Sequence, residues 1–473
     1  MQEIRTALTY DDVLLVPQRS ELRSRQNTDV STYLTKNIKL NIPLVPANMD
    51  TVTESKMAIA MAYLGSIGII HRFCSVDYQV KEVKKVKRKQ NVVIDHPFTI
   101  TTHTTLKEVR AKILEHNCQS FLVSDNGQDL LGILTSRDMD FVTDENTKVI
   151  EMMTPKEKLI TAPVGIEMEK AKEILSINKI EKLPIVDNAF RIRGLITATD
   201  IIRNYNNGHA SKDAKGRLLV GAAVGTKDDF MERVKALVEA EVDVLVVDIA
   251  HGHSVNAIEA IKEIKTKYPS IDIIGGNVAT AQGVKDLILA GADAVKVGIG
   301  SGSTCTTRIT TGFGVPQLSA IFNCAPVCKQ YNVPLIADSG IKQPGDMVKA
   351  LAAGADSVMM GGQFSGTEET PGAVLSYRGQ QYKISRGMAS LTAALARPNA
   401  KEKIEDVTPE GVESRVPFRG PAKNVVNLYV GGLRSGMSYA NARNLKELQE
   451  HAQFIRITNA GLTESHSHDN QVL

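Results

Sequence analysis

The most regular feature of the chain is a series of short apolar runs that end in small or polar residues. The eight runs begin at Ile42, Ile67, Leu219, Val242, Ile271, Ala294, Pro334 and Ser357. Continuous apolar runs of this kind are typical of strands buried on both faces of a parallel sheet. Amphipathic stretches such as 227–241 and 281–292 lie between most of them and predict helices. Eight strands that alternate with helices predict an α/β fold, a (β/α)8 barrel of the TIM type.

Two intervals between these strands are longer than one βα unit. Most strand starts lie 23 to 25 residues apart, but 152 residues separate Ile67 from Leu219, and 40 separate Ala294 from Pro334. The first interval can hold an inserted domain, so we expect a barrel in 1–90 and 205–473 and a separate module in 91–204. The second interval enlarges the loop after the sixth strand. Barrel enzymes carry their chemistry on the loops that follow the strands, so this loop is the first place to search.

The inserted stretch contains an internal repeat with an offset of 62 residues. GILTSRD at 132–138 recurs as GLITATD at 194–200, and FLVSD, which ends at 125, recurs as LPIVD, which ends at 187. Two such copies resemble a tandem CBS pair, a module that often binds adenine or guanine nucleotides. The resemblance implies that ATP or GTP is bound by the Thr and Asp of each copy: Thr135, Asp138, Thr197 and Asp200. The residues alone equally allow each Thr and Asp to cap the helix that follows.

Composition and charge exclude several classes of function. Lys and Arg number 56 against 53 Asp and Glu, and a net charge of +3 gives no electrostatic case for a nucleic-acid or membrane-surface protein. No apolar stretch approaches the ~20 residues that span a bilayer, and no secretory signal is recognisable. The five cysteines lack the spacing of a zinc site and favour a reducing compartment. We therefore expect a cytoplasmic protein that binds any anion locally.

One cysteine lies in a setting that differs from the others. The loop after the sixth strand reads GIGSGSTCTTRITTGFGVPQLSAI over 298–321, which places Cys305 among glycines and hydroxyl residues and close to Arg308. The thiolate is the reactive form of cysteine, and a polar loop with a nearby cation favours it. A lone cysteine is more often an inert core residue, and we expect that of the remaining four: Cys74, Cys118, Cys324 and Cys328. For Cys305 the surroundings predict a nucleophile.

The stretch GSGSTCTTR resembles the catalytic loop of the IMP dehydrogenase and GMP reductase family. Matching stretches occur along nearly the whole chain: LTYDDVLLVP, VPANMDTVTE, DIAHGHS, GGNVAT, IADSGI, PEGVESRVPF and FIRITNAGLTESHSHD. A CBS pair inserted after the second barrel strand is also a feature of this family. The resemblance implies an oxidoreductase of purine metabolism in which Cys305 bonds covalently to C2 of the purine. A hydride then passes between C2 and a nicotinamide.

The resemblance also assigns roles to matching residues at the reacting centre. It implies that Cys305 is the nucleophile and that Thr307 and Glu410 relay protons. It implies a substrate site, for a purine nucleoside monophosphate (GMP or IMP), made of Ser303, Asp338, Gly340, Gly361 and Gly362. Glycines allow the close approach of a phosphate to backbone N–H groups, although tight βα turns would explain them without a ligand.

Two further sites follow from the same resemblance. A nicotinamide cofactor would lie near Asp248, His253, Asn277 and Arg308. A monovalent cation, K+, would be bound by the carbonyls of Gly300, Gly302 and Cys305 together with Glu464, Ser465 and His466 of a neighbouring subunit. Oxygen ligands suit such a hard cation. A site shared between subunits implies a homotetramer, with an octamer as a further option.

The flap, about 386–420, distinguishes the two reactions of this family. Dehydrogenases activate water with an adjacent Arg-Tyr pair in the flap, whereas reductases expel ammonia and need no such pair. This flap has no Arg-Tyr pair, and approximately Lys401 and Glu402 occupy its place. Ser385 also replaces a Tyr that contacts the phosphate in dehydrogenases. The ESHSHD segment and the CBS pair, in contrast, are similar to dehydrogenases.

Because water activation is a chemical requirement, we give the missing pair the most weight. The sequence then predicts a GMP reductase, which converts GMP to IMP and ammonia with NADPH. The alternative is an IMP dehydrogenase, which oxidises IMP to XMP with NAD. A third hypothesis is a nucleotide-sensing pseudoenzyme that acts through its CBS pair, but the intact Cys305, Thr307 and Asp338 argue against it.

Overall fold

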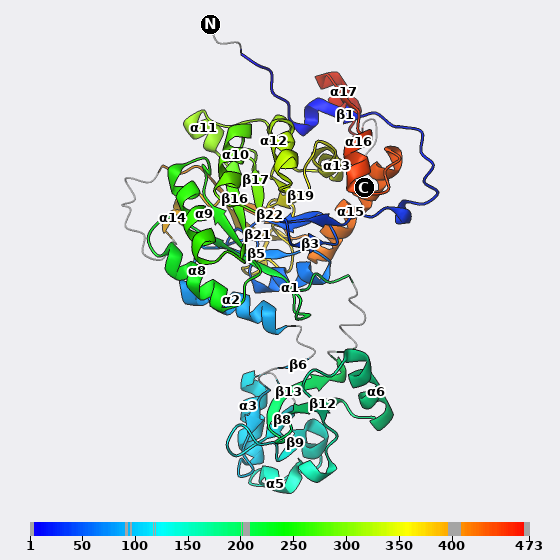
Figure 1. Ribbon diagram of the computed structural model, residues 1–473, viewed down its shortest axis with the longest axis vertical. Coiled ribbons are helices and arrows are strands. Elements are labelled where there is room, and N and C mark those ends of the chain that lie inside the picture. The colour runs from blue at the N-terminus through cyan, green and yellow to red at the C-terminus, as the bar shows by residue number, and fades with distance from the viewer. Residues whose placement is uncertain are drawn as a thin grey trace. The chain divides into compact units, whose positions relative to one another are not determined.

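The chain folds into two compact units with separate cores (Figure 1). One unit comprises Met1–Lys89 and His209–Leu473, and the other comprises Gln90–Gly208. The computed structural model describes residues 4–89, 93–94, 97–116, 118, 120–199, 201, 209–395 and 408–467.

The larger unit is built on an eight-stranded parallel sheet. Its strands are β4 (Leu44–Pro46), β5 (Gly68–Ile70), β14 (Val220–Val224), β15 (Val244–Asp248), β16 (Asp272–Val278), β17 (Ala294–Val297), β18 (Leu335–Asp338) and β19 (Ser357–Met360). The order β4-β19-β18-β17-β16-β15-β14-β5 makes a nearly closed ring, with each strand at one of the predicted apolar runs. The (β/α)8 prediction is therefore confirmed.

Side chains alternate between the inside of this ring and the layer under the helices. On β15, Val244 and Val246 belong to the cluster that fills the barrel interior, whereas Leu245 and Val247 belong to the cluster between strands and helices. This alternation follows from the period of two along a strand. Both faces are apolar, which explains the unbroken apolar runs of the sequence.

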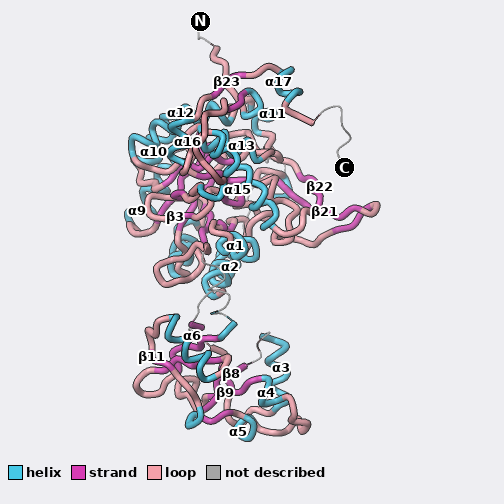
Figure 2. The backbone as a smooth tube through the Cα atoms, turned by 90° about the vertical axis from the view of Figure 1, so that its right-hand side faces the viewer, coloured by secondary structure: helices cyan, strands magenta, loops and turns pink. Residues whose placement is uncertain are grey.

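Helices surround the ring, as Figures 1 and 2 show. They are α1 (Ser55–Tyr63), α2 (Val76–Arg88), α8 (Phe230–Glu239), α9 (Val255–Lys267), α10 (Ala281–Leu289), α12 (Gln317–Tyr331), α13 (Pro344–Ala352), α15 (Ala422–Tyr439) and α16 (Leu445–His451). The helices predicted at 227–241 and 281–292 correspond to α8 and α10, each somewhat shorter than its amphipathic stretch. Several begin at a hydroxyl cap; Thr280, for example, accepts a hydrogen bond from the amide of Gly283 at 3.1 Å.

Smaller elements complete this unit. They are η1 (Tyr10–Asp12), β1 (Val13–Leu15), η2 (Arg25–Asn27), β2 (Thr32–Tyr33), β3 (Lys39–Leu40), α11 (Thr307–Thr311), β20 (Leu375–Tyr377), β21 (Gln380–Arg386), α14 (Leu391–Leu395), β22 (Glu413–Pro417), β23 (Phe454–Arg456) and α17 (Asn459–Glu464). Strands β20, β21 and β22 form an antiparallel sheet from which the flap begins and to which it returns. Lys401 and Glu402 lie outside the described residues.

The smaller unit contains two four-stranded sheets, β10-β9-β8-β7 and β11-β12-β13-β6. Its elements are β6 (Val93–Ile94), β7 (Thr99–Ile100), α3 (Leu106–His116), β8 (Ser120–Val123), β9 (Gly132–Thr135), α4 (Ser136–Met139), α5 (Val149–Met152), β10 (Thr154–Pro155), η3 (Lys156–Lys158), β11 (Ala162–Pro163), α6 (Met168–Asn178), β12 (Lys182–Val186) and β13 (Ile192–Thr197). The pairing of Phe121 with Leu134 recurs as that of Leu183 with Ile196. The strand register thus repeats at the same offset of 62 residues as the sequence.

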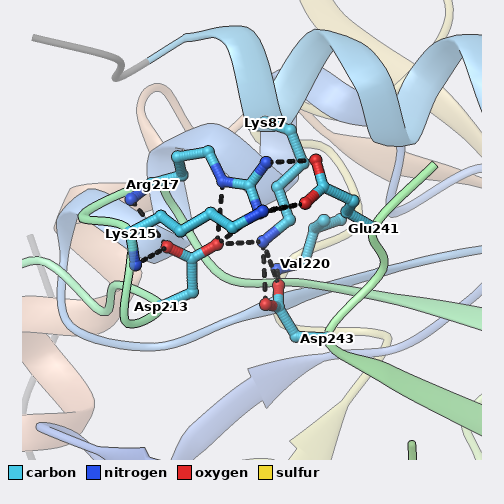
Figure 3. Close-up of polar contacts among 7 residues, drawn as sticks. All are labelled: Lys87, Asp213, Lys215, Arg217, Val220, Glu241 and Asp243. Atoms are coloured by element: carbon cyan, nitrogen blue, oxygen red, sulfur yellow. Dashed lines mark hydrogen bonds and ion pairs between the residues drawn. The ribbon is translucent and has the colours of Figure 1, made fainter. Parts of the chain in front are cut away.

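A buried network of charges lies at the amino-terminal ends of β14 and β15 (Figure 3). Lys87, whose side chain is 5% exposed, contacts both carboxylate oxygens of Asp243 at 2.8 and 2.7 Å and Asp213 at 3.0 Å. Asp243 also accepts the amide of Val220 at 2.7 Å. Burial raises the pKa of Asp243 above its ordinary value even though Lys87 opposes the shift. The network joins the end of α2 to the segment that leads into β14.

We expect the substitution Lys87→Met to destabilise the larger unit. It leaves two mostly buried carboxylates without their shared cation, and breaking a buried ion pair costs about 3 kcal/mol. Urea unfolding followed by circular dichroism measures the change. Lys215→Met is the matched control, because the Lys215 side chain is 66% exposed and its pair with Glu241 is worth less than about 1 kcal/mol. Equal effects of the two substitutions would contradict this account of the network.

Candidate active site

A cavity of about 450 Å³ opens at the carboxyl ends of the barrel strands. Segments that follow β4, β5, β15, β17, β18 and β19 line it, and so does the flap. Its lining includes these residues from the sequence prediction: Asp248, Asn277, Gly300, Gly302, Ser303, Cys305, Thr307, Asp338, Gly340, Gly361, Gly362 and Glu410. The fold therefore brings most of the expected site residues to one place.

A chain of hydrogen bonds connects the candidate nucleophile to the flap. The Cys305 thiol donates to Thr307 Oγ1 at 3.2 Å, and the Thr307 hydroxyl donates to Glu410 Oε2 at 2.7 Å. The backbone fixes this arrangement, because the Thr306 amide donates to the Glu410 carbonyl and the Val412 amide to the Thr304 carbonyl, both at 2.9 Å. A thiol, a hydroxyl and a carboxylate in series can carry a proton.

A group of charged side chains lies on the inner side of the same cavity. Lys296 Nζ is 2.6 Å from Asp338 Oδ2 and 3.0 Å from Asp248 Oδ1. Burial opposes the ionisation of Asp248, but Lys296 and Arg72 lower the pKa of its carboxyl below the ordinary value. The sequence analysis missed Lys296. A lysine in the middle of the apolar run AVKVGIG was the signal that could have found it.

Asn277 connects this group to the wall of the cavity. Its side-chain amide donates to Asp338 Oδ2 at 2.9 Å and to the Gly298 carbonyl at 2.8 Å. The other end of the side chain, Oδ1, is buried without a hydrogen-bond partner. A buried acceptor without a partner is unusual in a folded protein, and here it belongs to a residue that lines the cavity.

Another part of the cavity is suited to a phosphate. Gly340, Gly361 and Gly362 line it, and among the described residues no acceptor is assigned to their backbone N–H groups. A Cβ atom at Gly362 would lie 2.8 Å from Ser303 Oγ, so only glycine lets the backbone and this hydroxyl lie so close. Ser385 also lines the cavity, and its hydroxyl lies 3.1 Å from that of Ser365.

Other predicted residues have partners away from the cavity. His253 Nε2 lies 2.8 Å from Asp286 Oδ2 on α10, and Arg308 donates to the Val315 carbonyl at 2.6 Å within its own loop. Neither residue lines the cavity. Glu464, Ser465 and His466 are exposed at the end of α17, and they do not line the cavity either.

In the smaller unit, the structure shows the capping role that the sequence left open. The backbone N–H and the hydroxyl of Thr135 both donate to Asp138 Oδ2 at 2.7 Å, which forms a capping box at the start of α4. Thr197 is buried at the end of β13, and Asp200 lies outside the described residues.

The remaining cysteines include strongly buried thiols. Burial raises the pKa of Cys74 to about 11 and that of Cys324 to about 12, and it also raises the pKa of Cys328. In the described part of the chain, no three His, Cys, Asp or Glu side chains are grouped so as to hold a metal ion. None of the described helices is long and apolar enough to cross a membrane.

Comparison with known proteins identifies relatives over the whole length. The model of the IMP dehydrogenase / GMP reductase domain matches residues 7–468. Inosine-5'-monophosphate dehydrogenase of Aquifex aeolicus (strain VF5) is 53% identical and covers 100% of this chain and 97% of its own. The enzyme of the same name from Nitrosopumilus maritimus (strain SCM1) is 48% identical and covers 99% of both chains.

Some of the solved structures that resemble this chain bear a different name. A cysteine-to-alanine variant of GMP reductase from Trypanosoma brucei, in complex with guanosine 5'-monophosphate, superposes with a TM-score of 0.94 at 44% identity and 99% coverage of both chains. GMP reductase from the same organism in complex with guanosine 5'-triphosphate superposes with a TM-score of 0.83 at 40% identity, covering 96% of this chain and 98% of that one. The chain therefore belongs to the IMP dehydrogenase / GMP reductase family, oxidoreductases that act on purine nucleoside monophosphates with a nicotinamide cofactor.

Proposed function

We propose that this protein is a GMP reductase, which converts GMP to IMP and ammonia with NADPH as the reductant. The observation that carries the proposal is an intact Cys305–Thr307–Glu410 chain beside a flap with no Tyr between 386 and 413. The chain supplies what a covalent step at C2 needs, whereas the Arg-Tyr pair that a dehydrogenase uses on water is missing. The GMP-bound relative at 44% identity supports this assignment.

The site performs the first half of this reaction with its own side chains. Cys305 Sγ attacks C2 of GMP, and its proton passes through the Thr307 hydroxyl toward Glu410. The same relay returns a proton to the 2-amino group, which leaves as ammonia, so that a purine bonded to sulfur through C2 remains. A nicotinamide held beside Asp248 and Asn277 would supply a hydride to C2, and breaking the C2–S bond would then return the Cys305 thiolate and release IMP. Each turnover consumes one GMP, one NADPH and one proton.

The described residues fit both ligands of this reaction. The N–H groups of Gly340, Gly361 and Gly362, with Ser303, would hold the phosphate, and Asp338 would accept the ribose hydroxyls. Asn277 and Asp248 both line the cavity and would lie beside the nicotinamide cofactor. For the proposed reductase we expect NADPH as the reductant. The alternative dehydrogenase reaction would use NAD as the oxidant.

A monovalent cation fits the loop that carries Cys305. Among the described residues the carbonyls of Gly300 and Cys305 accept no hydrogen bond, and the Gly302 carbonyl accepts only the Cys305 amide, at 3.1 Å. We propose that these oxygens bind K+, with Glu464, Ser465 and His466 of a second copy completing the shell. The ion would hold the loop in shape. This sharing implies a homotetramer, with an octamer as a further option.

The second candidate is IMP dehydrogenase. The curated relatives at 48–53% identity favour it, and so does the ESHSHD segment at the end of the chain.

We also propose that the smaller unit is a CBS pair that binds ATP or GTP. Its repeated strand register supports this identification. The five free thiols suit a reducing compartment, for which we propose the cytoplasm.

A nicotinamide absorbance assay separates the candidates. With GMP and NADPH we expect absorbance to fall and ammonia to be released, and with IMP and NAD we expect no reaction. Cys305→Ala should remove activity while GMP still binds, because phosphate and ribose contacts remain. Turnover of IMP with NAD, and none of GMP with NADPH, would identify a dehydrogenase. No turnover of either substrate pair would favour a nucleotide sensor.

The proposed proton relay predicts how substitutions of Glu410 and Thr307 change the kinetics. Glu410→Gln and Thr307→Val should each lower kcat by about 10²-fold or more while the KM for GMP changes little, because the relay acts on the reacting bonds and not on ground-state binding. Thr310→Val is the matched control, because among the described residues its hydroxyl is given one hydrogen bond, a long one of 3.5 Å to the Pro409 carbonyl. A rise in KM with unchanged kcat would assign these residues to binding instead.

Calorimetric titration tests the nucleotide site of the smaller unit. With the barrel site saturated by GMP, ATP or GTP should still bind to the full chain, and Thr197→Val should weaken that binding about tenfold through the loss of one hydrogen bond to the ligand. Cys305→Ala serves as the control and should bind the triphosphate unchanged. No binding of either triphosphate would leave Thr135 and Asp138 with the capping role alone.

A further inference from the structure

Lys296 occupies an unusual place inside the barrel. It lies on β17 two residues after Ala294, a member of the interior cluster, so its side chain enters the ring from the same face of the strand. Only 3% of the side chain is exposed. Asp248 ends β15 and Asp338 ends β18, so the lysine connects strands that lie on both sides of its own.

The neighbouring strand β16 makes room for this lysine. A Cβ atom at Gly276 would lie 2.7 Å from Lys296 Cβ, a distance that side chains do not tolerate. With glycine at this position, the lysine can lean across β16 to Asp248, two strands away. Nζ reaches that carboxylate at 3.0 Å and the carboxylate of the adjacent strand, Asp338, at 2.6 Å.

Neutral groups also donate hydrogen bonds to the two carboxylates. The Asn48 amide donates to Asp248 Oδ2 at 3.0 Å, and the Ser339 hydroxyl donates to Asp338 Oδ1 at 2.9 Å. Burial opposes the charge on Lys296, but the two carboxylates raise its pKa above the ordinary value, so it remains an ammonium. Lys296 is therefore the cation that two anions lining the cavity share, and Arg72 adds a second positive charge near Asp248.

We propose that Lys296 is a positioning residue that holds Asp338 for the substrate and Asp248 for the cofactor at the same time. The assignment of the two carboxylates to the two ligands rests on the proposed function. Without the ammonium, two close and largely enclosed carboxylates repel one another, and both cannot stay ionised and aimed at their ligands. A single side chain thus maintains both halves of the site.

Steady-state kinetics of four variants test this proposal. Asp338→Asn should raise mainly the KM for GMP, and Asp248→Asn mainly the KM for NADPH. Lys296→Met should raise both KM values by about tenfold or more, because both carboxylates lose a charged partner. The double variant Lys296→Met with Asp338→Asn should recover much of the NADPH affinity, since Asp248 then has no neighbouring charge to repel it.

The rescue separates positioning from a purely structural role. A damaged barrel would lose further affinity in the double variant, whereas relief of repulsion improves it. Lys296→Arg should keep both KM values near those of the parent, and Lys296→Gln, which retains a donor without the charge, replaces the methionine variant if that one does not fold. A KM effect of Lys296→Met on one ligand alone, or no recovery in the double variant, would overturn the proposal.

If the parent enzyme turns over only IMP and NAD, the proposed reductase fails, yet the same variants measured with that pair still test Lys296.

Discussion

A strand that is buried on both faces can carry charged side chains only where the strand ends or where every charge is paired. The barrel obeys this constraint throughout: the interior and the layer under the helices are filled by apolar residues. Most polar groups therefore lie at the ends of the strands, and the cavity lies at the carboxyl ends. The burial of both faces of the sheet therefore places the site at the strand ends, whichever residues form it.

Two buried lysines, one on a strand and one on a helix, show how such pairing is achieved. Lys296 and Lys87 are almost fully buried, and each lies within 3.0 Å of oxygens from two carboxylates. The two lysines lie at opposite ends of the barrel strands and therefore have different effects. Lys87 lies at the amino-terminal ends of the strands and its partners face protein, so its network serves stability. The partners of Lys296 line the cavity, so its charge acts on whatever binds there.

Much of the fold, and less of the site, could be predicted from the sequence. The eight strands and the internal repeat could be predicted, because both are visible in short stretches of sequence. Burial on both faces of a strand gives a run of apolar residues, and the repeat gives the same short motif twice. The partners of long side chains depend instead on tertiary geometry. Arg308 is held by the Val315 carbonyl and His253 by Asp286, although both stand in motifs expected at the cofactor. The Thr307–Glu410 contact joins residues 103 positions apart, and only the resemblance to a family could suggest it.

The same reasoning bears on the choice between the two reactions. The overall identity of 48–53% to dehydrogenases counts every aligned residue equally, and both reactions require the same barrel and the same kinds of ligand. The reactions diverge only after the cysteine has bonded to C2. A dehydrogenase must then bring a base to a water molecule, whereas a reductase must already have given a proton to the departing amine. In the proposed reductase, Glu410 and Thr307 would supply this proton, and the flap sequence lacks the Arg-Tyr pair that activates water in a dehydrogenase. We therefore base the proposed reaction on a few residues of the flap and not on the identity of the whole chain.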